Sequence, residues 1–155
     1  MNMIYIPPPR PSLFIRLVGI EGFNPNISVP VPPTFHLAFD VDGVLPHYNA
    51  CSGGGKSMLR VSYHGMILAW ANVPRFCVNG NLINKKADDM VTIEAKAEGA
   101  MLREDIRNLV CSEQQAIGKT EFDLEGDVAG LGSLSCKIIY SNSQSTDSRT
   151  LCVIQ

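Results

Sequence analysis

Four acidic side chains stand at alternate positions of one segment: Glu121, Asp123, Glu125 and Asp127. Alternate residues of a strand point to the same face, so this spacing places the four carboxylates side by side. Neighbouring carboxylates repel one another and need solvent, cations or basic neighbours. The row therefore predicts a solvated acidic face and a possible binding surface for a basic partner or Ca²⁺, although calcium ligands usually come from a curved loop. A paired-carboxylate hydrolase is a weaker interpretation, because nothing in the sequence indicates a cleft.

The five cysteines suggest two bridges. Cys51 precedes and Cys77 follows an expected hairpin, so a disulfide between them would join the two hairpin ends. Cys136 and Cys152 lie in the last two strand patterns and form a second candidate pair. Each bridge would contribute about 3 kcal/mol on the chain-entropy model, and Cys111 would remain as a thiol. The alternative is five thiols in a reducing compartment.

A glycine-rich tract, Ser52-Gly53-Gly54-Gly55-Lys56-Ser57, resembles the end of a phosphate-binding loop. The spacing does not fit, because the first glycine of that motif would fall at Ala50. A strand pattern also follows Ser57, where the motif requires a helix. The tract is therefore expected to be a flexible surface loop.

No residue pattern indicates catalysis. The three histidines, His36, His47 and His64, lack the short spacings of metal ligands, and the chain shows neither a nucleophile-elbow serine nor a CxxC pair. We therefore expect no enzyme activity, no catalytic or metal-binding residues and no cofactor. Asn26-Ile27-Ser28 is an N-glycosylation acceptor, which has meaning only in a secreted or lumenal chain.

The length and charge of the chain exclude further classes of function. The chain has 155 residues, of which 45% are hydrophobic, so it is long enough for one domain with a real core. Its net charge of −2 and the absence of a basic run give no basis for nucleic-acid binding. The longest uncharged run, Gly22 to Phe39, contains four prolines and cannot form a membrane helix. No cleavable signal is expected either.

The elements that would position these residues are mostly strands. Residues 1–11 form a Pro-rich linker, and residues 12–155 form one domain. Two-residue periodicity predicts strands at 13–18, 35–41, 59–63, 66–70, 91–97, 120–128, 134–140 and 151–154, with a loop from Asp42 to Lys56 and another at 141–150. Trp70 is expected in the core, and His64-Gly65 in a primed hairpin turn.

One helix is expected between Met101 and Ile117, with Leu102, Ile106, Leu109 and Val110 on its apolar stripe and Gly118 as its stop. About seven strands and one short helix favour an all-β sandwich of two sheets.

Several motifs carry a family resemblance. These are Val41-Asp42-Gly43, Cys51 with the glycine tract, Val61-Ser62-Tyr63-His64-Gly65, Leu68-Ala69 and Val73-Pro74-Arg75-Phe76-Cys77. As a set they resemble the plant late embryogenesis abundant group two proteins, and more narrowly the harpin-induced and non-race-specific disease-resistance relatives. Asn24-Pro25-Asn26 is similar to a turn of the wider group. The resemblance covers residues 12–155.

The resemblance implies an immunoglobulin- or fibronectin type III-like sandwich, held outside the plasma membrane by an N-terminal membrane helix that this chain lacks. The Pro/Arg-rich segment Tyr5 to Pro11 is similar to the stretch that follows that helix. The expected function is a non-enzymatic, monomeric plant protein of defence or stress responses, which binds a protein, lipid or cell-wall component at the membrane or apoplast. If a membrane helix precedes the chain, it is membrane-associated or extracellular. The alternative is a soluble intracellular dehydration protectant or lipid carrier.

Overall fold

The computed structural model describes residues 12–22, 33–42, 49–79, 91–97, 104–141 and 149–155. The predicted linker 1–11, the acceptor Asn26, His47 and Leu102 lie outside these ranges, as does most of the predicted loop 141–150. Within the described ranges, no helix is both long and apolar enough to cross a membrane.

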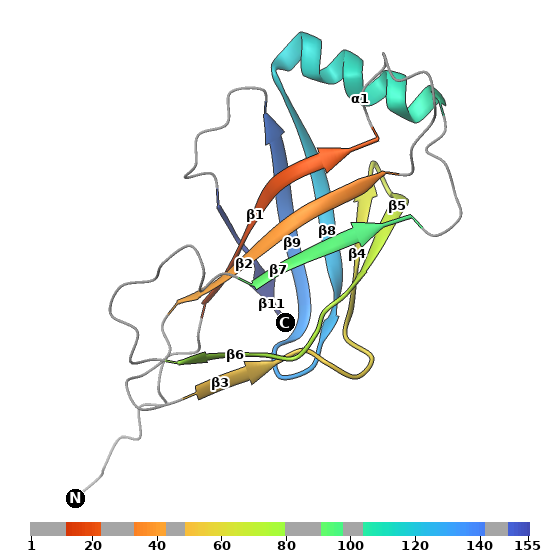
Figure 1. The fold of residues 1–155 in the computed structure, drawn as a ribbon. Coiled ribbons are helices and arrows are strands. Elements are labelled where there is room, and N and C mark those ends of the chain that lie inside the picture. The colour runs from red at the N-terminus through yellow and green to blue at the C-terminus, as the bar shows by residue number, and fades with distance from the viewer. Residues whose placement is uncertain (1–11, 23–32, 43–48, 80–90, 98–103, 142–148) are drawn as a thin grey trace, which may run out of the picture.

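The described chain is mostly β, with one helix (Figure 1). The strands are β1 (Ser12–Glu21), β2 (Thr34–Asp42), β3 (Asn49–Ser52), β4 (Met58–Tyr63), β5 (Met66–Asn72), β6 (Phe76–Asn79), β7 (Val91–Lys96), β8 (Lys119–Val128), β9 (Gly132–Ser141), β10 (Thr150–Leu151) and β11 (Val153–Ile154); the helix is α1 (Glu104–Ile117). Nine strands form one sheet in the order β10-β1-β2-β7-β5-β4-β8-β9-β11, and β3 pairs with β6 in a separate ribbon. All described pairings are antiparallel.

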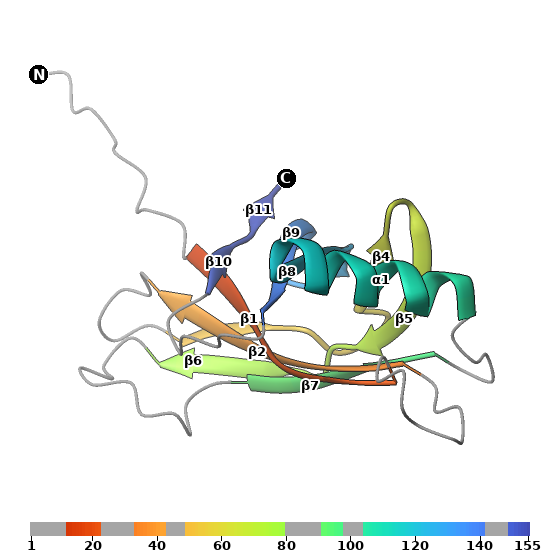
Figure 2. The same cartoon turned by 90° about the horizontal axis from the view of Figure 1, so that it is seen from above.

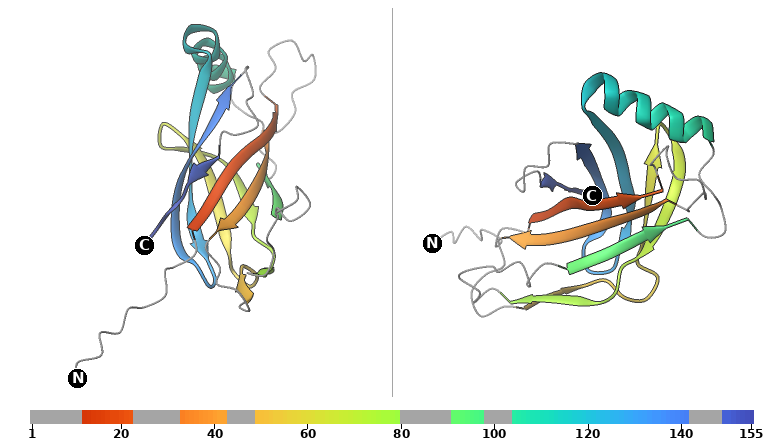
Figure 3. Two further views of the ribbon diagram at one scale, coloured as in Figure 1. Left: turned by 90° about the vertical axis from the view of Figure 1, so that its left-hand side faces the viewer. Right: turned by 45° about the horizontal axis from the view of Figure 1, so that its top comes forward.

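The nine-stranded sheet curves until its two edges nearly meet, which gives a barrel-like shape (Figures 2 and 3). One short segment bridges both edges: β10 pairs with β1, and β11, one residue later, pairs with β9. Between them, the amide of Cys152 donates to the carbonyl of Leu13 at 2.8 Å. The all-β class and single helix agree with the sequence, whereas this sheet order does not confirm a seven-stranded sandwich or an immunoglobulin-like topology.

A single hydrophobic core fills the space that the sheet encloses. Phe35 and Phe122 lie at its centre, with ring centroids 5.1 Å apart in an edge-to-face arrangement, and Tyr63 packs on Phe122 at 5.6 Å. Each of these side chains is at most 1% exposed. Burial of one such side chain contributes roughly 1.5–3 kcal/mol, so the interior is a packed core.

Helix α1 lies beside β8 at one end of the sheet (Figure 1). Its buried face consists of Ile106, Val110 and Gln114, which are spaced four residues apart. Leu109, predicted on the apolar stripe, is half exposed, because it lies about 100° around the helix axis from Val110. The helix ends at Ile117, and Gly118 follows as its predicted stop: its φ of 84° lets its amide donate to the carbonyl of Gln114.

The β4–β5 hairpin follows the prediction at its turn but not along its second strand. His64 and Gly65 both have positive φ (49° and 80°), as a primed two-residue turn requires. The register then shifts, because Val61 pairs with Ala69 while Ser62 pairs with Ile67. Leu68 is the extra residue of this bulge, and the side chains beyond it change face.

Trp70 is therefore not a core residue, and that prediction is wrong. Its side chain is 42% exposed, while Ala69 and Ala71 on either side of it are buried. The bulge at Leu68 places the two alanines inward and the indole on the outer face.

The predicted loop from Asp42 to Lys56 contains a strand. β3 pairs with β6 over four residues, and Cys51 lies directly opposite Cys77. The sequence does not predict this ribbon, because its strands are short and neither shows a clear apolar alternation.

Candidate functional site

The acidic row of β8 faces outward, as predicted, and neighbouring strands supply its partners. Glu125 forms an ion pair with Arg60 on β4, with Nη2 and Oε2 3.0 Å apart. On β9, Lys137 lies 3.9 Å from Glu121, and Ser133 donates a 2.5 Å hydrogen bond to Asp127. Repulsion along the row is thus reduced by basic and hydroxyl neighbours.

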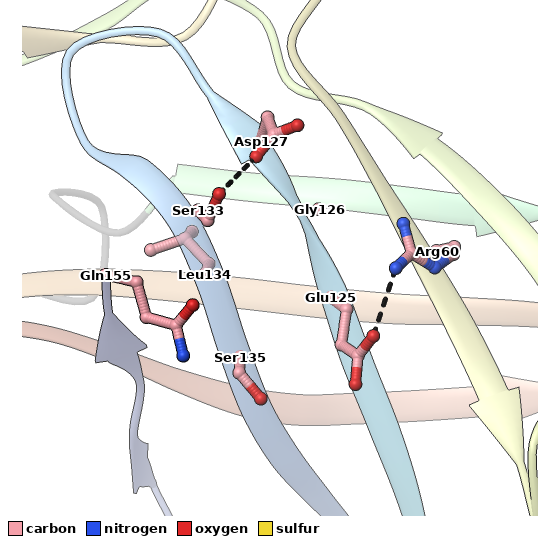
Figure 4. A pocket seen from close by; sticks show the side chains of 8 residues that line it. All are labelled: Arg60, Glu125, Gly126, Asp127, Ser133, Leu134, Ser135 and Gln155. Atoms are coloured by element: carbon pink, nitrogen blue, oxygen red, sulfur yellow. Dashed lines mark hydrogen bonds and ion pairs between the residues drawn. The ribbon is translucent and has the colours of Figure 1, made fainter.

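The row borders a surface depression of ≈ 400 Å³ (Figure 4). Only its second half contributes, because Glu125 and Asp127 line the depression whereas Glu121 and Asp123 do not. The remaining lining residues come from β4, β9 and the chain after β11: Arg60, Gly126, Ser133, Leu134, Ser135 and Gln155.

The depression offers both hydrogen-bond donors and hydrogen-bond acceptors. Arg60 and Ser135 supply donors, Glu125 and Asp127 supply acceptors, and Gln155 supplies both. Figure 4 shows the Arg60–Glu125 and Ser133–Asp127 pairs on its lining. Ser133 donates to a carboxylate, which does not make it a nucleophile, since activation needs a base oriented by a third group. Within the described ranges, no three His, Cys, Asp or Glu side chains gather as metal ligands.

Both predicted cysteine pairs lie at disulfide-bonding distance. The Cα atoms are 4.0 Å apart in Cys51–Cys77 and 4.5 Å apart in Cys136–Cys152. The first pair is exposed on the β3–β6 ribbon. The second is buried between β9 and the edge-bridging segment, residues 150–154, which comprises β10 and β11. Cys111 on α1 is the remaining described cysteine and is half-buried.

The glycine tract uses its amides within the fold. The amide of Gly53 donates to Ala129, that of Gly54 donates to Val73, and that of Ser57 donates back to Gly54. These donors are therefore not presented to a phosphate, and the tract is a structured turn between β3 and β4.

A second depression, ≈ 440 Å³, lies on the outer face of β1, β2 and β7. His36 lines it, and the ring nitrogens of His36 lie 3.3 Å from Glu21 and 3.4 Å from Glu94. A hydrogen bond from Lys96 and its positive charge lower the pKa of Glu94. The sequence does not predict this grouping, because His36, Glu21 and Glu94 come together only through strand pairing.

Sequence reasoning also missed the surroundings of Trp70. Its direct cross-strand partners are Arg60 on β4 and Lys96 on β7. The one available signal was Ala69 and Ala71, small residues that alternate with Trp70 and suit an inward face.

Comparison of the chain with protein-family models, with curated proteins and with solved structures gives no match. The resemblance to the late embryogenesis abundant group two proteins therefore stays a hypothesis.

Proposed function

We propose that the protein is a non-enzymatic binding domain of the plant late embryogenesis abundant group two type, which acts in defence or stress responses at the membrane or apoplast. Its partner is a protein, a lipid surface or a cell-wall component, bound at the depression of Figure 4. The proposal includes the finer fold assignment, an immunoglobulin-like arrangement in which opposite parts of the curved sheet pack across one core.

The observation that carries this proposal is the polar lining of the depression. Arg60 and Glu125 form an ion pair and Asp127 accepts a hydrogen bond from Ser133, so contacts within the lining restrain these charged groups. Such pre-positioned groups bind a polar partner without first losing much side-chain entropy. The filled core also favours binding at the outer surface over carriage of a lipid inside the sheet.

Binding of purified protein to washed plant cell walls, and separately to phosphatidylcholine vesicles, tests the proposal. We expect wild-type protein to sediment with one of the two. The Glu125→Ala/Asp127→Ala variant should then bind about tenfold more weakly, because each lost contact involves a charged group. Glu21→Ala, which removes an exposed carboxylate beside His36 and lies outside the depression, is the control and should bind like wild type. Equal binding by all three proteins would remove the depression as the site.

Counting thiols in protein from its native tissue separates the proposal from its alternative. An oxidising compartment predicts one thiol, at Cys111, and two disulfides. Five thiols would instead favour the intracellular dehydration protectant or lipid carrier.

A further inference from the structure

Trp70 is the single tryptophan of the chain and lies on the outer face of β5, 42% exposed. A tryptophan on a strand usually turns its large apolar ring inward, where burial is most favourable. Here the bulge at Leu68 holds the indole at the surface, and the inward positions beside it belong to Ala69 and Ala71.

The charges beside the indole balance. Arg60 pairs with Glu125 on β8, the side away from Trp70, and Lys96 pairs with Glu94 on its own strand at 3.0 Å. Each cation is thus held by a carboxylate rather than left to attract an anion. An uncharged polar ligand meets both donors and acceptors at such a surface, whereas an anionic ligand meets Glu94 and Glu125.

Trp70 pairs across strands with Arg60, which lines the depression of Figure 4. Trp70 pairs with Arg60, Arg60 pairs with Glu125, and Glu125 pairs with Ser135, so the four residues form one row across β5, β4, β8 and β9. Arg60 belongs both to the row and to the lining of the depression. At ~4.8 Å per strand the row extends about 15 Å, the reach of a short oligosaccharide.

We propose that this row binds an uncharged cell-wall glycan, with the C–H face of one sugar ring stacked on Trp70 and the hydroxyl groups of the next rings bonded to Arg60, Glu125 and Ser135. The inference rests on the proposed function and names the partner class. A flat apolar indole beside fixed donors and acceptors matches a pyranose, which has an apolar face and a polar rim. Within the row itself, a lipid chain would contact only the indole, because Arg60, Glu125 and Ser135 are polar.

Fluorescence and calorimetry test this assignment with a β-1,4-linked glucose hexamer as the uncharged probe. Because Trp70 is the sole tryptophan, any change in indole emission reports a change in the surroundings of this one side chain. We expect saturable quenching or a blue shift in wild type. By calorimetry, Trp70→Ala should weaken binding about tenfold, while Trp70→Tyr retains a stacking ring and stays within about threefold. Leu109→Ala, at an exposed apolar position on α1, should bind like wild type.

The outcomes separate this inference from the proposed function. Wall binding that requires Glu125 and Asp127 but survives Trp70→Ala would overturn the glycan row and keep the depression as a site. Tighter binding of polygalacturonate than of the glucose hexamer would overturn the choice of an uncharged ligand. Emission changes with phosphatidylcholine vesicles but not with the hexamer would replace the glycan with a lipid surface.

Discussion

Tyr63, at the end of β4, donates a hydrogen bond from its phenol to the carboxylate of Glu113 in α1. Two further contacts attach the helix to the sheet end: Gln114 donates to the carbonyl of Tyr140 at 2.7 Å, and Arg107 donates to that of Gly22 at 3.1 Å. The Tyr63 contact differs from these because its donor belongs to the core, where the ring packs on Phe122. The helix is thereby linked directly to the aromatic centre of the domain.

Tyr63→Phe should lower the free energy of unfolding by about 1.5–3 kcal/mol, the range for hydrogen bonds to charged groups. The ring packing stays, so the loss reports the hydroxyl alone. Urea denaturation followed by circular dichroism measures it. Glu113→Gln keeps an acceptor and should lose less. A Tyr63→Phe variant as stable as wild type would show that the contact contributes nothing.

Stability should also fall at alkaline pH through the same residue. Burial raises the pKa of Tyr63 most, and the hydrogen bond and charge of Glu113 raise it further. Since the neutral phenol is favoured in the folded state, its stabilisation is complete below the unfolded tyrosine pKa of ~10 and is lost as the pH rises above it. The free energy of unfolding is measured at a pH below and a pH above that value. Its fall between the two should be smaller for Tyr63→Phe than for wild type. Parallel declines in the two proteins would contradict the assignment.

The sequence predicted those parts of the fold that interactions between neighbouring residues determine. The alternation of β1 and β2, the primed turn at His64-Gly65 and the stop at Gly118 each follow from a few neighbouring residues. The acidic row of β8 was predicted for the same reason, since two-residue periodicity alone assigns its face.

The remaining features depend on pairing between distant segments. The exposure of Trp70 follows from one extra residue opposite β4, and no pattern within β5 reveals it. The depression combines Arg60 with Glu125, which are 65 residues apart and meet only when β4 pairs with β8. Closure of the sheet likewise depends on one short segment that pairs on both sides.

The two disulfides should respond differently to reduction. Cys51 and Cys77 are exposed, whereas Cys136 and Cys152 are 3% and 5% exposed, so a thiolate reaches the first pair more easily. Timed alkylation with mass spectrometry under a mild thiol reductant should label Cys51 and Cys77 first. Simultaneous labelling of all four would show that the sheet edges open readily.

Removal of the buried bridge should also weaken closure of the sheet. Cys136–Cys152 ties the edge-bridging segment to β9, so Cys136→Ala/Cys152→Ala should lower stability by about 3 kcal/mol and speed amide exchange in β1 and β9. Cys51→Ala/Cys77→Ala is the matched control, because its ribbon lies outside the nine-stranded sheet. Faster exchange in β1 and β9 of that control would contradict a specific role for the buried bridge.

Gly53 and Gly55 provide a paired test of the glycine tract. Both have positive φ, 84° and 60°, so alanine at either position carries the left-handed backbone cost of about 1 kcal/mol. A Cβ at Gly53 would also lie 2.3 Å from the carbonyl oxygen of Pro74, whereas one at Gly55 would have nothing within 4 Å. Gly53→Ala should therefore lower the denaturation midpoint clearly more than Gly55→Ala. Equal midpoints would mean that the turn between β3 and β4 moves freely away from Pro74, contrary to the hydrogen bond from Gly54 to Val73 that holds it there.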